Sequence, residues 1–192
     1  RRQRQMCIRD RCIFVLSQDF KNELIRRGIK SDIHLTSTKV PDYFISGFDL
    51  SMRQGKAENI MYSGRIEKAK GVYETVDTFS ILKSQYKDLT LTFVGDGSEL
   101  PKLKQYVENK KIKDVRFTGR LCGEDFKKEY INADMYLFLS YTEGMPTVVL
   151  EAMIFGLPIF TRKVGGLIDF FENGKMGYIS VSYTHLTLPT TS

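Results

Sequence analysis

The sequence contains few of the residues that hold metal ions or form disulfides. Its 192 residues include three cysteines and two histidines. Cys7, Cys12 and Cys122 form no C-x-x-C pair, and no two aspartates stand at positions i and i+2. We therefore predict a reduced, cytoplasmic protein that uses no cofactor and no metal ion. His34, in an apolar run, is most simply a structural residue.

Long apolar runs are also absent. None reaches the roughly 18 residues that a membrane-spanning helix requires. The first residues do not show the basic start and apolar stretch of a signal peptide. Both observations favour a cytoplasmic location. A second expectation is a peripheral contact with the inner face of the membrane.

The two ends of the chain look foreign to the fold. Residues 1–10 and 181–190 can be encoded by one DNA cassette read in opposite orientations, and that cassette resembles a sequencing adapter. We interpret 1–11 and 181–192 as adapter-derived scars and exclude them from fold reasoning. Residues 1–11 hold five arginines and one aspartate, so the net charge falls from +6 to +2 without them. The rest has no basic stripe with interleaved aromatics, which disfavours nucleic-acid binding.

From residue 59 onward, short β-rich runs alternate with segments of helical period. This alternation predicts an α/β domain over 59–180, with a Rossmann-like parallel sheet flanked by helices. In the turn after one strand, Ser98 is a candidate N-cap for the next helix. The expected strands are Ile60–Tyr62, Leu89–Val94, Val115–Phe117, Met135–Leu139 and Pro158–Phe160.

Residues 12–58 differ in character. Ile13–Leu16 and Ile33–Leu35 are predicted to be strands, and Gln18–Arg27 a helix. Residues 38–58 are polar and weakly periodic, like a connection between domains. We predict that 12–58 is the remnant of one α/β domain together with a linker.

Three clusters contain residues suited to chemistry. In the first, Gly64 and Arg65 follow a strand, and Lys70 comes five residues later. Ligands of open α/β sheets bind at the carboxyl ends of the strands, where two cations can hold a phosphate. Taken alone, this stretch fits an ordinary charged surface loop equally well.

The second cluster joins a loop to a helix start. Pro146 suits the first turn of that helix, whose free amides and dipole attract anions. Glu143 lies before the helix and Glu151 on its second turn, so both carboxylates are predicted to reach one cleft and accept hydrogen bonds from sugar hydroxyls. The alternative is that both are ordinary surface charges.

The third cluster is Gly165 and Gly166 with Asp169, again after a strand. The glycine pair is suited to close backbone approach, but by itself this signal favours a plain turn.

In this order the motifs resemble the family 4 (group 1) glycosyltransferases, which have the two-domain GT-B fold. The resemblance covers about residues 12–179, with 59–180 as the truncated donor-binding domain. The Glu-x7-Glu element is its most specific part. The matching residues are Gly64-Arg65, Lys70-Gly71, Val94–Gly97, Val115–Gly119, Glu143–Pro146, Glu151–Met153, Gly156–Pro158 and Gly165-Gly166.

The resemblance implies a role for each matching residue. Arg65 and Lys70 would hold the diphosphate of a UDP- or GDP-sugar and stabilise the leaving group, while Glu143 contacts the transferred sugar. Glu151 would bind the ribose. The other donor-binding residues it implies are Gly64, Gly119, Arg120, Leu121, Gly144, Met145, Pro146 and Thr147.

The resemblance also implies the reaction. Such enzymes are retaining hexosyltransferases that act on glycan or lipid-linked acceptors, for example in bacterial surface polysaccharide synthesis. A non-catalytic nucleotide-sugar binding module and a GT-B-fold epimerase are the alternatives. Most of the acceptor domain is missing from this sequence, so we expect the fragment alone to be inactive.

Overall fold

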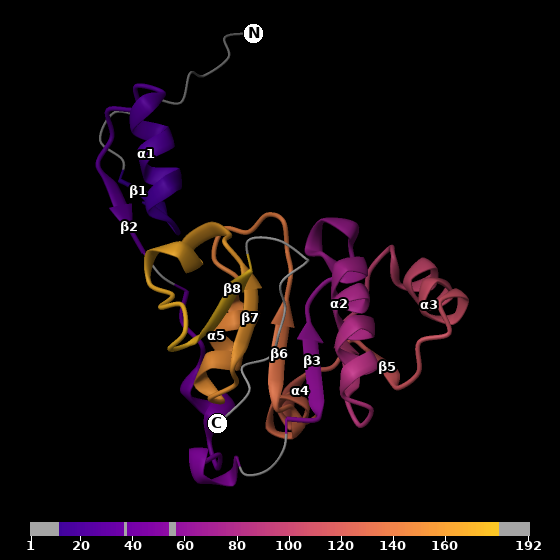
Figure 1. Ribbon diagram of the computed structural model, residues 1–192. Coiled ribbons are helices and arrows are strands. Elements are labelled where there is room, and N and C mark those ends of the chain that lie inside the picture. Colours follow the sequence, from indigo (N-terminus) through magenta and orange to yellow (C-terminus); the bar gives the residue numbers. More distant parts are fainter. Residues whose placement is uncertain (1–11, 37, 54–56, 181–192) are drawn as a thin grey trace, which may run out of the picture.

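The computed structural model describes residues 12–180 apart from residue 37 and residues 54–56. The predicted adapter scars therefore lie outside the described residues. The main sheet has six strands. Figure 1 shows this sheet with helices packed around it and a smaller β1–α1–β2 unit standing to one side.

The main sheet is parallel throughout and has the strand order β5-β4-β3-β6-β7-β8. The predicted α/β fold with a parallel sheet is confirmed. The central strands are apolar on both faces because helices cover both, as expected for parallel sheets. The strands are β3 (Asn59–Ser63), β4 (Thr90–Val94), β5 (Val115–Gly119), β6 (Met135–Phe138), β7 (Ile159–Arg162) and β8 (Gly177–Ser180).

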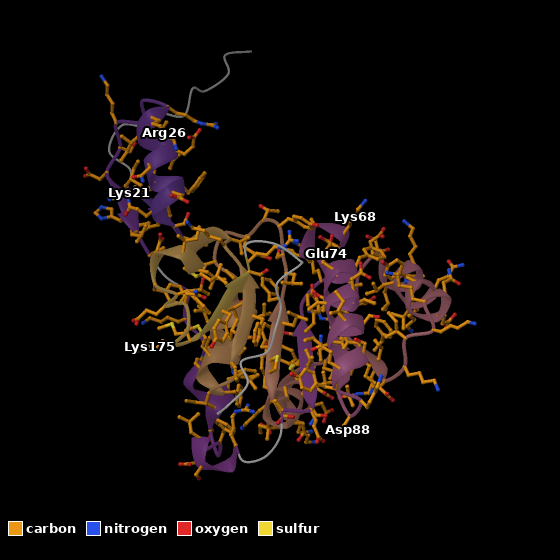
Figure 2. All side chains as sticks on the ribbon, viewed as in Figure 1. Lys21, Arg26, Lys68, Glu74, Asp88 and Lys175 are labelled. Carbon is orange, nitrogen blue, oxygen red and sulfur yellow. The ribbon has the colours of Figure 1, made fainter. Side chains whose placement is uncertain are left out.

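The strand order reverses between β3 and β6. From β3 the chain adds β4 and β5 on one side, then returns to add β6, β7 and β8 on the other side. The chain leaves β3 and β6 toward opposite sides of the sheet, and the region beyond the carboxyl ends of these two strands, where open α/β sheets bind their ligands, is here called the crevice. Figure 2 marks this end of the domain with Lys68 and Glu74, whereas Asp88 lies at the opposite end.

The helices place an almost continuous apolar face on the sheet. Val76 and Phe79 of α2 are completely buried, as are Leu103 of α3, Tyr130 of α4 and Ala152 of α5. The helices are α2 (Val72–Gln85), α3 (Leu100–Asn109), α4 (Gly123–Asn132) and α5 (Thr147–Ile154).

The small unit pairs β1 (Ile13–Val15) in parallel with β2 (Ile33–Leu35), joined through α1 (Gln18–Arg26). These elements match the sequence predictions to within one residue. The unit leaves the large side chains of Phe14 and Phe20 mostly exposed. It touches the main domain where the backbone N–H of Gln18 donates to Asp169 Oδ2 at 2.8 Å.

The predicted linker is held firmly against the main domain. Its described part forms two short 3-10 helices, η1 (Asp42–Ile45) and η2 (Leu50–Met52). The Arg53 guanidinium donates to the carbonyl oxygens of Tyr130 (2.7 Å), Ala133 and Phe155. These contacts tie the linker to α4 and α5.

Two local expectations need correction, and two elements were missed. Ser98 does not cap α3: the helix begins at Leu100, with Pro101 in its first turn, and Glu99 is the N-cap, without a side-chain hydrogen bond. Pro146 has an extended backbone and is the N-cap of α5 rather than a residue of its first turn. Helix α4 and strand β8 were not predicted, because neither contains a run of apolar residues long enough to show a period.

No helix in the described part of the chain has both the length and the apolar character needed to cross a bilayer.

Candidate functional site

The crevice between β3 and β6 is bordered by two loops that are hydrogen-bonded to each other. In the first loop, residues 64–71 contain the 3-10 helix η3 (Lys68–Lys70). In the second, the N–H of Tyr141 donates to the carbonyl oxygen of Ala69 at 3.0 Å. Because this bond joins the loops directly, it helps to fix where Lys70 and Glu143 stand relative to each other.

Gly71 allows the loops to approach this closely. Its φ is +68°, and a Cβ placed there would lie 2.0 Å from the carbonyl oxygen of Leu139. No side chain fits in that space, and the positive φ is itself unfavourable for other residues. A glycine is therefore required directly after Lys70.

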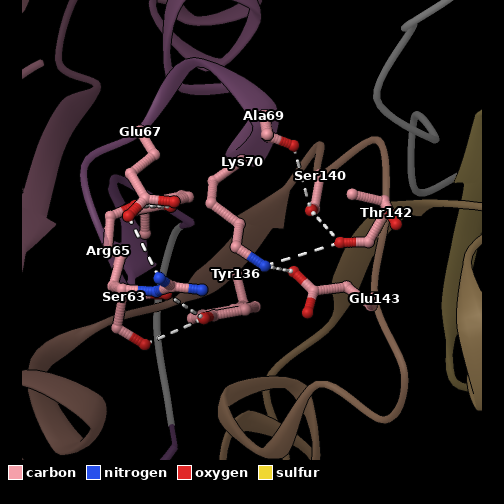
Figure 3. A network of polar contacts seen from close by, with 10 residues as sticks. Ser63, Arg65, Glu67, Ala69, Lys70, Tyr136, Ser140, Thr142 and Glu143 are labelled. Atoms are coloured by element: carbon pink, nitrogen blue, oxygen red, sulfur yellow. Dashed lines mark hydrogen bonds and ion pairs between the residues drawn. The ribbon is translucent and has the colours of Figure 1, made fainter.

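Lys70 and Glu143 form an ion pair in the crevice, as Figure 3 shows. Lys70 Nζ lies 2.7 Å from Glu143 Oε1, and the two side chains are only 15% and 13% exposed. Lys70 Nζ also lies 3.5 Å from the carbonyl oxygen of Thr142. The structure therefore brings these two predicted residues together. Because both side chains are shielded from water, they attract each other more strongly than an exposed pair would.

Arg65 is placed differently. Its side chain is 71% exposed and pairs with Glu67 through Nη1 and Oε1, 3.1 Å apart. The backbone carbonyl of Arg65 accepts a hydrogen bond from Tyr62 Oη at 2.9 Å. This bond holds the loop to β3, while the mostly exposed Arg65 guanidinium is paired with Glu67 (Figure 3).

The glycine pair Gly165-Gly166 follows β7. Its local sequence favours a plain turn, but in the fold the pair packs against another loop. The N–H of Gly166 donates to the carbonyl oxygen of Gly144 at 2.6 Å. A Cβ on Gly165 would lie 2.3 Å from that same oxygen and 2.5 Å from the carbonyl oxygen of Glu143. The β7 loop therefore packs against the backbone that presents Glu143, which the local sequence did not reveal.

Glu151 faces the protein interior on one side. Tyr130 Oη donates to Glu151 Oε2 at 2.8 Å, and Ser63 Oγ lies 2.8 Å from the hydroxyl oxygens of both Tyr130 and Tyr136. Burial raises the pKa of Glu151 above its usual value, and the hydrogen bond from Tyr130 opposes that shift. The pKa of Tyr130 is raised well above its usual value, chiefly by burial.

On its other side Glu151 lines a cavity of about 260 Å³. Leu121 lines the same cavity, together with Phe44 from the linker and the first residues of α4. Two residues predicted to contact the ribose and the base thus border one space. Gly119 ends β5 with a positive φ, and Arg120 beside it is exposed.

The start of α5 supplies the remaining predicted residues. Thr147 is the first helical residue, and the buried Pro146 before it accepts a hydrogen bond from the N–H of Val149 at 3.1 Å. A Cβ on Gly166 would meet the methyl group of Met145 at 2.3 Å, so the β7 loop also packs on this segment. The β7 loop thus packs both on the segment before α5 and on the backbone that presents Glu143.

Sequence reasoning missed the buried hydroxyl network. Ser63, Tyr130 and Tyr136 are completely buried. No spacing links them, because they come from β3, α4 and β6, which meet only in the folded sheet. In the described ranges, no group of three or more His, Cys, Asp or Glu side chains is arranged to hold a metal ion.

Comparison with known families gives a match over most of the chain. Residues 51–188 match the family described as "Glycosyl transferases group 1". Among solved structures, the chain superimposes on the pneumococcal O-GlcNAc transferase GtfA, in complex with UDP and GlcNAc, with a TM-score of 0.74. The identity is 23% over 89% of this chain and 34% of the other. This likeness shows the fold, that of the GT-B glycosyltransferases.

Two relatives show the range of similar sequences. The glycogen synthase of Mycobacterium tuberculosis is 32% identical over 126 residues, which cover 65% of this chain and 30% of the relative. The amylovoran biosynthesis glycosyltransferase AmsK of Erwinia amylovora is 25% identical over 175 residues, 86% of this chain and 42% of the relative. The chain thus spans less than half the length of either relative.

Proposed function

Because this chain belongs to the group 1 glycosyl transferases, we propose that it is the donor-binding part of a retaining hexosyltransferase. The donor is a UDP- or GDP-sugar, and the acceptor is a glycan or a lipid-linked sugar of a bacterial surface polysaccharide. The amylovoran enzyme among its relatives supports a polysaccharide product. The UDP bound to the pneumococcal transferase supports a nucleotide donor.

The observation that carries this proposal is the shielded Lys70–Glu143 pair, which lies where the strand order reverses between β3 and β6. When the bond to the anomeric carbon breaks, negative charge develops on the leaving diphosphate. A fixed cation aimed at that charge lowers the barrier without having to reorganise during the reaction. Removing one such group commonly costs about 100- to 1000-fold in kcat.

The remaining roles follow from position. Arg65, which is mostly exposed, exchanges its ion pair with Glu67 for the same diphosphate, and the N–H groups of Met145 and Thr147 at the start of α5 add donors. Once the diphosphate replaces Glu143 as the partner of Lys70, the Glu143 carboxylate accepts hydrogen bonds from hydroxyl groups of the transferred sugar. Glu151 accepts from the ribose, and the base enters the cavity beside Leu121.

Charge neutralisation by Arg65 and Lys70 is proposed to replace a metal ion. We propose a cytoplasmic reaction, with the inner face of the membrane as the place where a lipid-linked acceptor is met. No nucleic acid takes part.

Calorimetric titration of the 192-residue chain with UDP and with GDP tests the donor site. Lys70→Met and Glu151→Ala are each expected to weaken binding by about tenfold or more, since each removes a charged partner. Arg116→Met is the matched control, because Arg116 pairs with Glu129 on β5 and α4 away from the crevice. Unchanged affinity in both site variants, with the control also unchanged, would place the nucleotide elsewhere.

Binding without transfer is a second candidate for the chain by itself. It is favoured because the chain spans less than half the length of the relatives above. We expect the purified chain to bind UDP or GDP and to release no sugar to an acceptor. Product analysis by mass spectrometry with donor and a glycan acceptor checks this, and donor alone tests for epimerisation. Formation of a glycosylated product would show that the chain is sufficient for catalysis.

A further inference from the structure

Three buried hydroxyl groups lead from the core of the domain to Glu151. Tyr136 of β6 contacts Ser63 of β3, Ser63 contacts Tyr130 of α4, and Tyr130 contacts Glu151 of α5. Each of the three oxygen–oxygen distances is 2.8 Å. Figure 3 shows the first step of this chain, between Tyr136 and Ser63.

The direction of these hydrogen bonds follows from the acceptor at the end. An ionised carboxylate only accepts, and so does the carbonyl oxygen of Val148, 3.3 Å from Tyr130 Oη. Tyr130 Oη therefore donates its single proton to Glu151 and Val148 and has none left to donate to Ser63. Ser63 must then donate to Tyr130, and Tyr136 donates its single proton to Ser63, where both Oγ at 2.8 Å and the carbonyl oxygen at 3.1 Å accept it. The hydroxyl groups of Ser63 and Tyr130 consequently point toward Glu151, and the first strengthens the second.

The ring of Tyr130 is held in place independently of its hydroxyl group. It stacks on Phe155 with centroids 5.4 Å apart, and Phe44 meets it edge-on at 5.7 Å. Its carbonyl oxygen accepts from Arg53 Nη2 at 2.7 Å. A donor on so rigid a support fixes the rotamer of the carboxylate that it binds.

Only one oxygen of Glu151 is used in this way. Among the described residues Oε1 receives no hydrogen bond, and the side chain borders the 260 Å³ cavity. Because the carboxylate is anchored through Oε2, Oε1 is left as an acceptor at a fixed position on a residue that lines the cavity, and an adjacent pair of hydroxyl groups can donate to it.

We propose that Tyr130 is a positioning residue that orients Glu151 to recognise the ribose hydroxyls of the donor nucleotide, with Ser63 and Tyr136 supporting it from the core. This inference rests on the proposed function, which places the ribose at Glu151. It adds a source of discrimination between ribonucleotides and deoxyribonucleotides that lies outside the binding cleft.

The test compares ribo- and deoxynucleotide binding in Tyr130→Phe. The 192-residue chain is titrated with UDP and 2′-deoxy-UDP, and with GDP and 2′-deoxy-GDP, and the ratio of the two affinities is measured. In the wild type we expect a preference for the ribonucleotide on the order of tenfold, as for a hydrogen bond to a charged group. Tyr130→Phe should reduce that ratio to about threefold and leave the affinity for the deoxynucleotide unchanged.

Two further variants make the result specific. Tyr106→Phe removes a hydroxyl group that donates to Asp77 at 2.9 Å on the outer helices, and should leave the ratio unchanged. Ser63→Ala keeps Tyr130 but removes its donor, so the ratio should fall by less than in Tyr130→Phe. A merely structural role for Tyr130 would weaken both nucleotides equally and leave the ratio at its wild-type value.

Glu151→Ala separates this inference from the proposed function. If that variant loses the preference while Tyr130→Phe keeps it, Glu151 binds the ribose without help from Tyr130 and the inference is wrong. If Glu151→Ala keeps the preference, the ribose lies elsewhere and the ribose assignment fails together with the inference. Absence of binding by any nucleotide would overturn the proposed function itself.

Discussion

Replacement of Gly71 by alanine should couple a loss of stability to a loss of nucleotide binding. Gly71 follows Lys70 and packs directly beneath the loop that contains Glu143. An added methyl group would lie 2.0 Å from the carbonyl oxygen of Leu139, which is backbone at the end of β6 and cannot rotate away. One of the two loops must therefore move.

The loss of unfolding free energy in Gly71→Ala has two parts. A left-handed backbone conformation costs an alanine about 1–2 kcal/mol. Forcing a methyl group into an occupied space adds about 1–3 kcal/mol. We expect Gly71→Ala to lose about 2–5 kcal/mol of unfolding free energy. Gly174→Ala is the matched control, because Gly174 also has a positive φ, of +84°, but nothing lies within 4 Å of its added Cβ. Gly174→Ala should therefore lose only the backbone contribution of about 1–2 kcal/mol.

Urea unfolding followed by far-UV circular dichroism measures both variants, and calorimetry measures UDP and GDP binding. Gly71→Ala should be the less stable of the two and should also bind nucleotide more weakly, since the movement displaces Lys70. Gly174→Ala should bind as the wild type does. Equal losses of stability, or unchanged binding in a folded Gly71→Ala, would refute the reasoning that close approach positions the cation.

Three other changes have defined outcomes. Glu143→Gln frees the cation of Lys70, so free UDP or GDP should bind about tenfold more tightly in calorimetry. Arg53→Met removes hydrogen bonds to three carbonyl oxygens and should lower the unfolding free energy by about 2–4 kcal/mol in urea, whereas Arg116→Met should cost less than about 1 kcal/mol. Burial raises the pKa of Glu151, so its contribution to stability is complete at low pH and is lost as the pH rises through the raised pKa. The Tm of Glu151→Gln, measured by calorimetry, should therefore improve relative to wild type as the pH rises above about 4, the ordinary pKa of a glutamate.

Each of these outcomes can fail separately. Weaker nucleotide binding in Glu143→Gln would mean that the carboxylate helps to hold the diphosphate site open rather than competing for Lys70. Equal destabilisation by the two arginine replacements would show that the linker contacts contribute no more than a surface ion pair. A Tm difference that does not vary with pH would place Glu151 in a solvent-like environment.

The sequence by itself determined the architecture of the main domain. Alternating apolar runs and helical segments predicted a parallel sheet flanked by helices, and the fold confirms it. The same local patterns located Lys70, Glu143 and Glu151 on loops or a helix that follow strands. Such patterns are readable because strand and helix periods are properties of neighbouring residues.

Only the tertiary structure decided how these residues meet. Strand β6 inserts beside β3 although more than seventy residues separate them in the chain, and this order creates the crevice. It also brings Ser63, Tyr136 and Tyr130 into contact beneath Glu151, and it turns Gly165 from a turn residue into a packing surface for Glu143. Contacts of this kind depend on which strands pair and how closely their loops approach. That is a property of the whole sheet, and no local spacing of residues encodes it.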